Sequence, residues 1–148
     1  MGSVFDDSSI ESRTPVTLLL ASPLEEDHSS LREMLTQSRW RLLETHTCQE
    51  ALALIKRHDV PVVICARTLP DGDWRTLLEA TVDMPERPQL IVSCRRTDHH
   101  LWADVLSLGG YDVLATPFDA AEVCRVVFLA WYSARHGQTR RASAATAA

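Results

Sequence analysis

The chain has 148 residues, of which 45% are apolar and 24% are charged, a balance typical of one soluble globular domain with its own core. No stretch of about 18 apolar residues could span a bilayer, so the membrane class is excluded, as are the collagenous and fully disordered classes. Fifteen basic residues against 20 acidic ones give a formal net charge of -5, so we expect neither a nucleic-acid nor a membrane partner.

The two ends of the chain differ in composition from its middle. Residues 1–14 are rich in Ser and Asp, and residues 137–148 read GQTRRASAATAA. Both segments are poor in large apolar side chains, so they are predicted to be a flexible N-terminal arm and a flexible C-terminal tail. Residues 15–136 are predicted to form a single domain.

The cysteines and the N-terminus indicate the compartment. The four cysteines are widely spaced and form no CxxC pair, which argues against a zinc ribbon and a redox dithiol. The N-terminus lacks the basic start and apolar run of a secretory signal. We therefore expect a cytoplasmic protein with reduced cysteines and no metal site.

Apolar runs of strand length alternate with segments of helical period through the central block. The runs occupy residues 17–21, 40–45, 60–66, 89–94 and 112–117. This alternation predicts an α/β fold, in which a parallel five-stranded sheet is covered by helices on both faces. Three of the runs are continuously apolar, so three strands are expected at the centre of the sheet.

Five helices are predicted from the apolar stripes between these runs. The first opens with the acidic residues 25–27, which suit a helix N-terminus. The second is expected to be capped by Thr47, with Glu50 completing a capping box. The stripes consist of Leu31, Met34 and Leu35, then Ala51, Leu54 and Ile55, then Trp74, Leu77 and Leu78, then Trp102, Val105 and Leu106, and finally Val123, Val127 and Ala130.

The last predicted helix is apolar nearly all round, because residues 126–132 read VVFLAWY. Val127, Ala130 and Trp131 suffice for packing on the sheet. The remaining apolar side chains are expected to project elsewhere, and an exposed patch of that size usually marks a binding surface. These candidate interaction residues are Val126, Phe128, Leu129 and Tyr132.

The sequence LPDGDW follows the third predicted strand, and LATPF ends the fifth. With five βα units, the chain resembles the receiver domain of bacterial two-component response regulators over residues 16–135. The resemblance implies a three-layer, doubly wound (βα)5 flavodoxin-like fold with strand order 2-1-3-4-5, whose ligand chemistry lies at the carboxyl ends of the strands. It also implies a cis Thr116–Pro117 peptide bond.

In that family, three carboxylates hold a magnesium ion and accept a phosphoryl group, assisted by a hydroxyl side chain and a lysine. The corresponding positions here are Ser22 and Pro23 for the acidic pair, Ala66 for the phosphoacceptor, Ser93 for the hydroxyl and Thr116 for the lysine. Only Ser93 keeps the family's chemistry. The resemblance therefore implies a degenerate receiver without phosphotransfer, magnesium or other cofactor, and not an enzyme.

The lysine content also indicates that the family's lysine is missing from the site. Fourteen of the 15 basic residues are arginine, and the single lysine is Lys56. It lies near the end of the second predicted helix, remote from the carboxyl ends of the strands, so we expect a solvated cation there.

The expected function is that of a phosphorylation-independent, receiver-like signalling module. It would act through protein-protein interaction, as a homodimer or by docking on another signalling protein. In response regulators the fourth helix, fifth strand and fifth helix form a common dimerisation face, so the resemblance adds Trp102 and Val113 to the candidate interaction face.

Two alternatives stay open. The first is an active phosphoacceptor protein whose acidic site has moved to Asp71 or Asp73. The second is a sensor of a small anionic ligand, in which Arg67, Arg95 and Arg96 border the vacated pocket.

Overall fold

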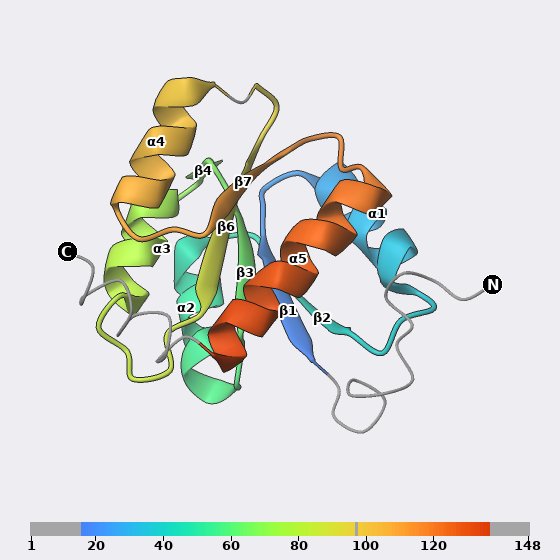
Figure 1. Cartoon of the computed structure of the whole chain (residues 1–148), viewed down its shortest axis with the longest axis horizontal. Helices are drawn as coiled ribbons and strands as arrows, with labels where there is room; N and C mark the ends of the chain where they lie inside the picture. The colour runs from blue at the N-terminus through green and yellow to red at the C-terminus, as the bar shows by residue number, and fades with distance from the viewer. Residues whose placement is uncertain (1–15, 97, 137–148) are drawn as a thin grey trace.

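The computed structural model describes residues 16–96 and 98–136, and Figure 1 shows their arrangement. The predicted arm and tail lie outside the described residues. The strands are β1 (Thr17–Ala21), β2 (Arg41–Thr45), β3 (Val62–Ala66), β4 (Thr68–Leu69), β5 (Gly72–Asp73), β6 (Gln89–Cys94) and β7 (Asp112–Ala115). The helices are α1 (Glu25–Leu35), α2 (Cys48–Arg57), α3 (Trp74–Thr81), α4 (His99–Ser107) and α5 (Ala120–Arg135).

The main sheet has five parallel strands in the order β2-β1-β3-β6-β7. Since β6 and β7 are the fourth and fifth predicted strands, this confirms the order 2-1-3-4-5. The three central strands β1, β3 and β6 are almost fully buried, as continuous apolar runs require. The short antiparallel pair β4-β5 directly after β3 was not predicted.

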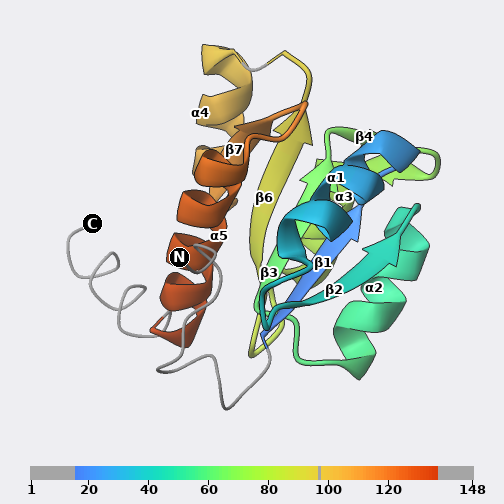
Figure 2. The ribbon, with the colours of Figure 1, turned by 90° about the vertical axis from the view of Figure 1, so that its right-hand side faces the viewer.

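Helices cover both faces of the sheet and complete three layers. Figures 1 and 2 show α1 and α5 on one face, with α2, α3 and α4 on the other. Because side chains of a strand alternate between faces, Leu18 and Leu20 enter the core beneath α1 and α5, whereas Leu19 enters the second core. Within the described ranges no helix is long and apolar enough to cross a membrane.

Helix α5 buries Val126, which the sequence pattern assigned to the interaction face. Val126 is only 1% exposed, so its assignment to the interaction face was wrong. It lies three residues after Val123 and four before Ala130, and these spacings place all three side chains on one stripe against the sheet. Val126 therefore belongs to the core, and of the candidate interaction residues in α5 only Phe128, Leu129 and Tyr132 are exposed.

Candidate functional site

The carboxyl edge of the sheet brings the predicted site positions together. Ser22 follows β1 and donates its backbone N–H to the carbonyl of Thr45 (3.1 Å). Ala66 ends β3 directly beside Ser93 of β6 in the parallel ladder. Thr116 follows β7, donates its N–H to the carbonyl of Cys94 (3.0 Å), and precedes Pro117 through a cis peptide bond. Parallel strands meet at this edge because all their carboxyl ends point the same way.

The first turn of α1 brings the carboxylate of Asp27 to the end of β1, a contact that the sequence did not predict. The hydroxyl of Ser22 donates to Asp27 Oδ2 at 2.7 Å, and the N–H of Leu24 donates to the same hydroxyl at 3.1 Å. Asp27 is 5% exposed although it lies in the first turn of α1. The acidic trio does open this helix as predicted, but one of its members turns inward to the strand end.

The residues at this edge do not fit a divalent cation. Magnesium requires several oxygen ligands in near-octahedral geometry, and the acidic positions of the fold hold a hydroxyl committed to Asp27 and a proline. In residues 16–96 and 98–136, no group of three or more His, Cys, Asp or Glu side chains could hold a metal ion.

Ser93 retains its hydroxyl but lacks a partner. Its Oγ is the one buried side-chain polar atom without a hydrogen bond in the described part of the chain. The adjacent ladder residue, Ala66, offers only a methyl group. Burying an unpaired polar group costs about 1–3 kcal/mol, so this hydroxyl does not stabilise the fold.

Asp71 and Asp73, the acids of the relocated-site alternative, are both helix caps. Asp71 accepts hydrogen bonds from the backbone N–H groups of Cys48 (2.7 Å) and Gln49 (3.0 Å), and these bonds hold its pKa below the ordinary value. Asp73 accepts from the N–H of Thr76 at 3.1 Å in a reciprocal capping box. Both carboxylates point at helix N-termini, which stabilises anions. These bonds use both oxygen atoms of Asp71 and the Oδ1 atom of Asp73.

At the N-terminus of α2 the predicted Thr47 cap is present, but the predicted capping box with Glu50 is not. Thr47 accepts from the N–H of Glu50 at 3.1 Å. The Glu50 carboxylate reaches the N–H of His46 (2.8 Å), one residue before the position that a capping box requires. Lys56 lies in the last turn of this helix and is exposed, in agreement with its predicted role as a solvated cation.

Charges of both signs meet at the carboxyl edge. Arg95 pairs with Glu26 at 2.8 Å, and both side chains are exposed. Arg67 and Arg96 are also exposed. Because Glu26 and Asp27 add carboxylates to the same edge, it is not the purely cationic rim that the anionic-ligand alternative requires.

A second candidate site is the face formed by α4, β7 and α5. Of the predicted interaction residues, Trp102 is 49% exposed and Tyr132 is 53% exposed, whereas Val113 is half-buried. Phe128 and Leu129 are also exposed. Leu106 of α4 and Leu108 directly after it are exposed too, although the sequence placed Leu106 on a buried stripe. We define the exposed apolar face as Trp102, Leu106, Leu108, Phe128, Leu129 and Tyr132.

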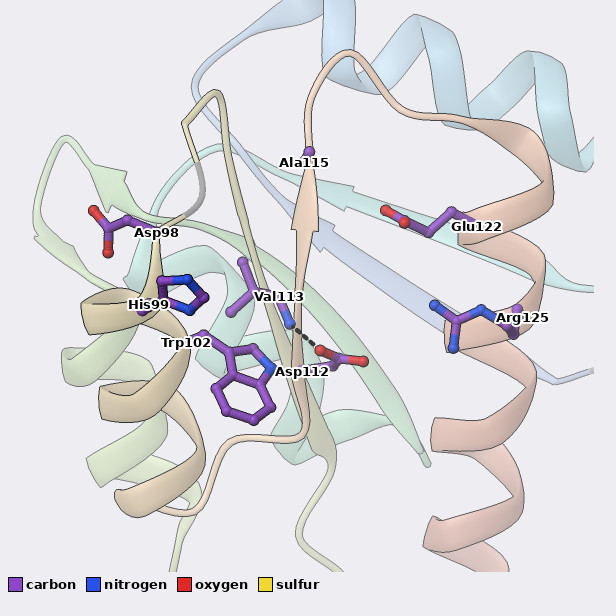
Figure 3. Close-up of a pocket in the computed structure, with 8 residues that line it drawn as sticks. All are labelled: Asp98, His99, Trp102, Asp112, Val113, Ala115, Glu122 and Arg125. Carbon is purple, nitrogen blue, oxygen red and sulfur yellow. Dashed lines mark hydrogen bonds between the residues drawn. The ribbon is translucent and has the colours of Figure 1, made fainter.

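A groove of about 720 Å³ runs between α4 and α5 over β7. Figure 3 shows its lining of Asp98, His99, Trp102, Asp112, Val113, Ala115, Glu122 and Arg125. Asp98 caps α4 by accepting from the N–H of Leu101 (2.7 Å), and this bond lowers its pKa. Within the described ranges Glu122 and Arg125 join no ion pair, so the groove offers free charges of both signs beside an indole ring.

No family model matches the sequence, and no curated relative does either. Solved structures match most of the chain. The signal receiver domain of an HD domain-containing protein from Pseudomonas fluorescens has a TM-score of 0.76 at 25% identity, covering 85% of this chain and 93% of that one.

Two further neighbours have the same architecture at lower identity. A CheY-like response regulator receiver domain protein from Methanospirillum hungatei gives a TM-score of 0.73 at 15% identity, over 84% of this chain and 99% of that one. The CheX-CheY-BeF3-Mg complex from Borrelia burgdorferi gives a TM-score of 0.73 at 19% identity, and the match covers 86% of this chain and 96% of that one. This chain therefore has the CheY-like, flavodoxin-like fold of response regulator receiver domains.

Proposed function

We propose that this chain is a phosphorylation-independent, receiver-like signalling module that acts through protein contacts on its α4-β7-α5 face. The observation that carries the proposal is Ala66, which stands at the end of β3 where a phosphoacceptor carboxylate would be needed. A methyl group has no nucleophilic atom, so no phosphoryl bond can form there.

The surroundings of Ala66 support the same proposal. Phosphoryl transfer is driven by positive charge held against the reacting oxygens. Here Ser22 is bonded to Asp27, and Thr116 stands where a cation would be needed. Loss of the acceptor, the metal-binding acids and the cation together fits a scaffold used for recognition, with neither magnesium nor another cofactor.

Incubation of the full chain with acetyl phosphate and Mg²⁺ is expected to produce no phosphorylated species. Intact-mass spectrometry would measure this, with an active receiver domain as the positive control. Asp71→Asn and Asp73→Asn serve as matched variants, because each removes one of the acids proposed for a relocated site. Phosphorylation of the wild type that disappears in either variant would overturn the proposal in favour of that site.

The α4-β7-α5 face supplies what a contact surface needs. It has six exposed apolar side chains, of which Trp102 also lines the groove. The groove contains Glu122 and Arg125, which form no ion pair within the described ranges. Charges of opposite sign on one surface can pair with a second copy of the same surface in a two-fold arrangement. We propose a homodimer through this face, or docking on another signalling protein with a complementary surface.

Replacing Phe128 by aspartate is expected to convert a dimer into a monomer, since a charge placed within an apolar contact must be desolvated. Sedimentation equilibrium of the full chain measures this as a halving of the mass. Ala53→Asp is the matched control, because it introduces the same charge at an exposed position on α2, on the opposite face of the sheet. A wild type that remains monomeric at high concentration would rule out the homodimer.

A further inference from the structure

The groove between α4 and α5 has an acidic lining and an aromatic wall. Its carboxylates belong to Asp98, Asp112 and Glu122, and one guanidinium, that of Arg125, opposes them. Figure 3 shows Glu122 and Arg125 pointing from α5 towards β7, with Asp112 and Trp102 opposite them. The lining therefore has an excess of negative charge next to an indole ring that is 49% exposed.

Two of these carboxylates have oxygen atoms available for a cation. Asp112 Oδ1 accepts from the N–H of Val113 at 2.8 Å, whereas its Oδ2 has no hydrogen bond within the described residues. Glu122 uses only its backbone N–H, which donates to Asp119 at 3.0 Å, and its carboxylate joins no ion pair in residues 16–96 and 98–136. A guanidinium can stack on an indole while its N–H groups donate to a carboxylate, so this combination favours an arginine side chain.

Residues 137–148 carry the matching charge. They read GQTRRASAATAA, in which Arg140 and Arg141 are adjacent and no residue is acidic. Residues 1–15, by contrast, contain three acidic residues and one arginine, so an acidic groove disfavours them. Of the two segments outside the described residues, the C-terminal one is thus the electrostatic complement of the groove.

This segment begins within reach of the groove. His136 follows Arg125 by 11 positions, a rise of about 16 Å along a helix. Arg141 follows His136 by five positions, and an extended chain of that length spans about 17 Å. Leu129 lies one turn after Arg125 on the same side of α5 and is 44% exposed, so a segment that turns back along the helix meets apolar surface on its way.

We propose that residues 137–148 dock in the groove of their own chain. The two arginines bind there against Trp102, Asp112 and Glu122. The inference rests on the proposed function only in that the groove belongs to the face assigned to protein contacts. A tethered segment acts at an effective concentration on the order of millimolar, so it competes with a partner protein for this face.

NMR of the Trp102 indole N–H in the full chain tests the contact, and Trp102→Phe identifies the signal. Replacing both arginines, as Arg140→Ala/Arg141→Ala, is expected to shift this signal, because a cation leaves the face of the ring. The same replacement should cause a much smaller shift when Asp112→Asn and Glu122→Gln are present, since the arginines then have no carboxylate to pair with. An equal shift in both backgrounds, or none in either, would overturn the proposal.

Lys56→Ala/Arg57→Ala is the matched control. It also removes two adjacent basic residues, which are exposed at the end of α2. The Trp102 signal is expected to stay in place in this variant. A shift as large as that caused by Arg140→Ala/Arg141→Ala would attribute the effect to net charge and contradict docking.

A dilution series separates docking within one chain from docking between two copies. Within one chain, the difference between the wild type and Arg140→Ala/Arg141→Ala persists at the lowest concentration, because the segment stays tethered to its groove. A difference that vanishes on dilution would place the segment in the groove of a second copy and overturn the proposal.

A synthetic peptide with the sequence of residues 137–148 tests the competition. Added to Arg140→Ala/Arg141→Ala, it should return the Trp102 signal to its wild-type position. It should bind the wild type several-fold more weakly, because the groove is already occupied there. Equal affinity for both chains would contradict the proposal. These readouts involve neither phosphorylation nor the mass of the chain, so a failure of docking and a failure of the proposed function are distinguishable.

Discussion

Replacing Val126 by aspartate is expected to destabilise the fold by more than about 4 kcal/mol, because it removes a buried side chain and introduces an unpaired buried charge. Val126 is 1% exposed and packs in the core beneath α5 with Val123, Val127 and Ala130. The side chains around it in that core are apolar, so they offer a carboxylate no hydrogen bond or opposite charge. Urea unfolding of the full chain measures the effect, and a loss of this size is a large share of the total stability of a domain.

Phe128→Asp is the comparison variant, since it also introduces an aspartate, two residues further along α5. Phe128 is 42% exposed, and its contact with Trp131, at a ring-centroid distance of 5.8 Å, is the main interaction lost. The expected cost is only about 1 kcal/mol. The pair separates packing from recognition, because the first variant should lose the fold and the second only the contact surface. Similar stabilities for both variants would contradict the burial of Val126.

The strands follow from local sequence for a physical reason, whereas their order in the sheet was implied only by the resemblance to receiver domains. A strand buried on both faces must be apolar throughout, so the runs in β1, β3 and β6 identify the centre of the sheet without tertiary information. The face of a helix that enters the core is harder to predict when apolar residues surround it. In α5 the spacing of Val123, Val126 and Ala130 was present in the sequence, but the neighbouring Phe128 and Leu129 masked it.

The candidate site, too, has features that the local sequence predicts and contacts that it does not. The location of Ser22, Ala66 and Thr116 at strand ends was predictable, because strand ends and the Thr116-Pro117 step fix those positions along the chain. The contact between His28 and Glu44 could not be predicted from the sequence. It requires α1 to lie against β2 while Glu44 is held beside Leu20 in the ladder, and no local pattern records either condition.

The loop after β3 gives the clearest case of a tertiary contact that sequence alone cannot reveal. Asp71 looks like a free acid near the carboxyl edge, yet both of its oxygen atoms accept bonds from the first N–H groups of α2. Together with the β4-β5 pair and the Asp73 cap of α3, it ties this loop to two helices. A segment bound at three points is poorly suited to respond to chemistry at β3, which agrees with a module that is not switched by phosphorylation.

Asp71→Ala is therefore expected to lower Tm by about 4 °C at neutral pH, as loss of a helix N-terminal acceptor does. The pKa of Asp71 is depressed in the folded state, chiefly by the N–H of Cys48 and then that of Gln49, so its contribution is present above the unfolded value near pH 3.9. It disappears as the pH falls through the folded value. The gap between variant and wild type should thus be constant from about pH 5 to pH 8 and close in stronger acid.

Two further variants identify the cause of that gap. Asp71→Asn keeps one acceptor oxygen, so it should recover part of the lost Tm at neutral pH without the acid dependence. Asp59→Ala removes an exposed aspartate after α2, at the other end of the helix, and should leave Tm unchanged. If Asp71→Ala behaved like Asp59→Ala, the loop would not be clamped to α2. The β3-α3 segment would then be free to move as in a responsive receiver, and the proposal of a phosphorylation-independent module would lose its mechanical support.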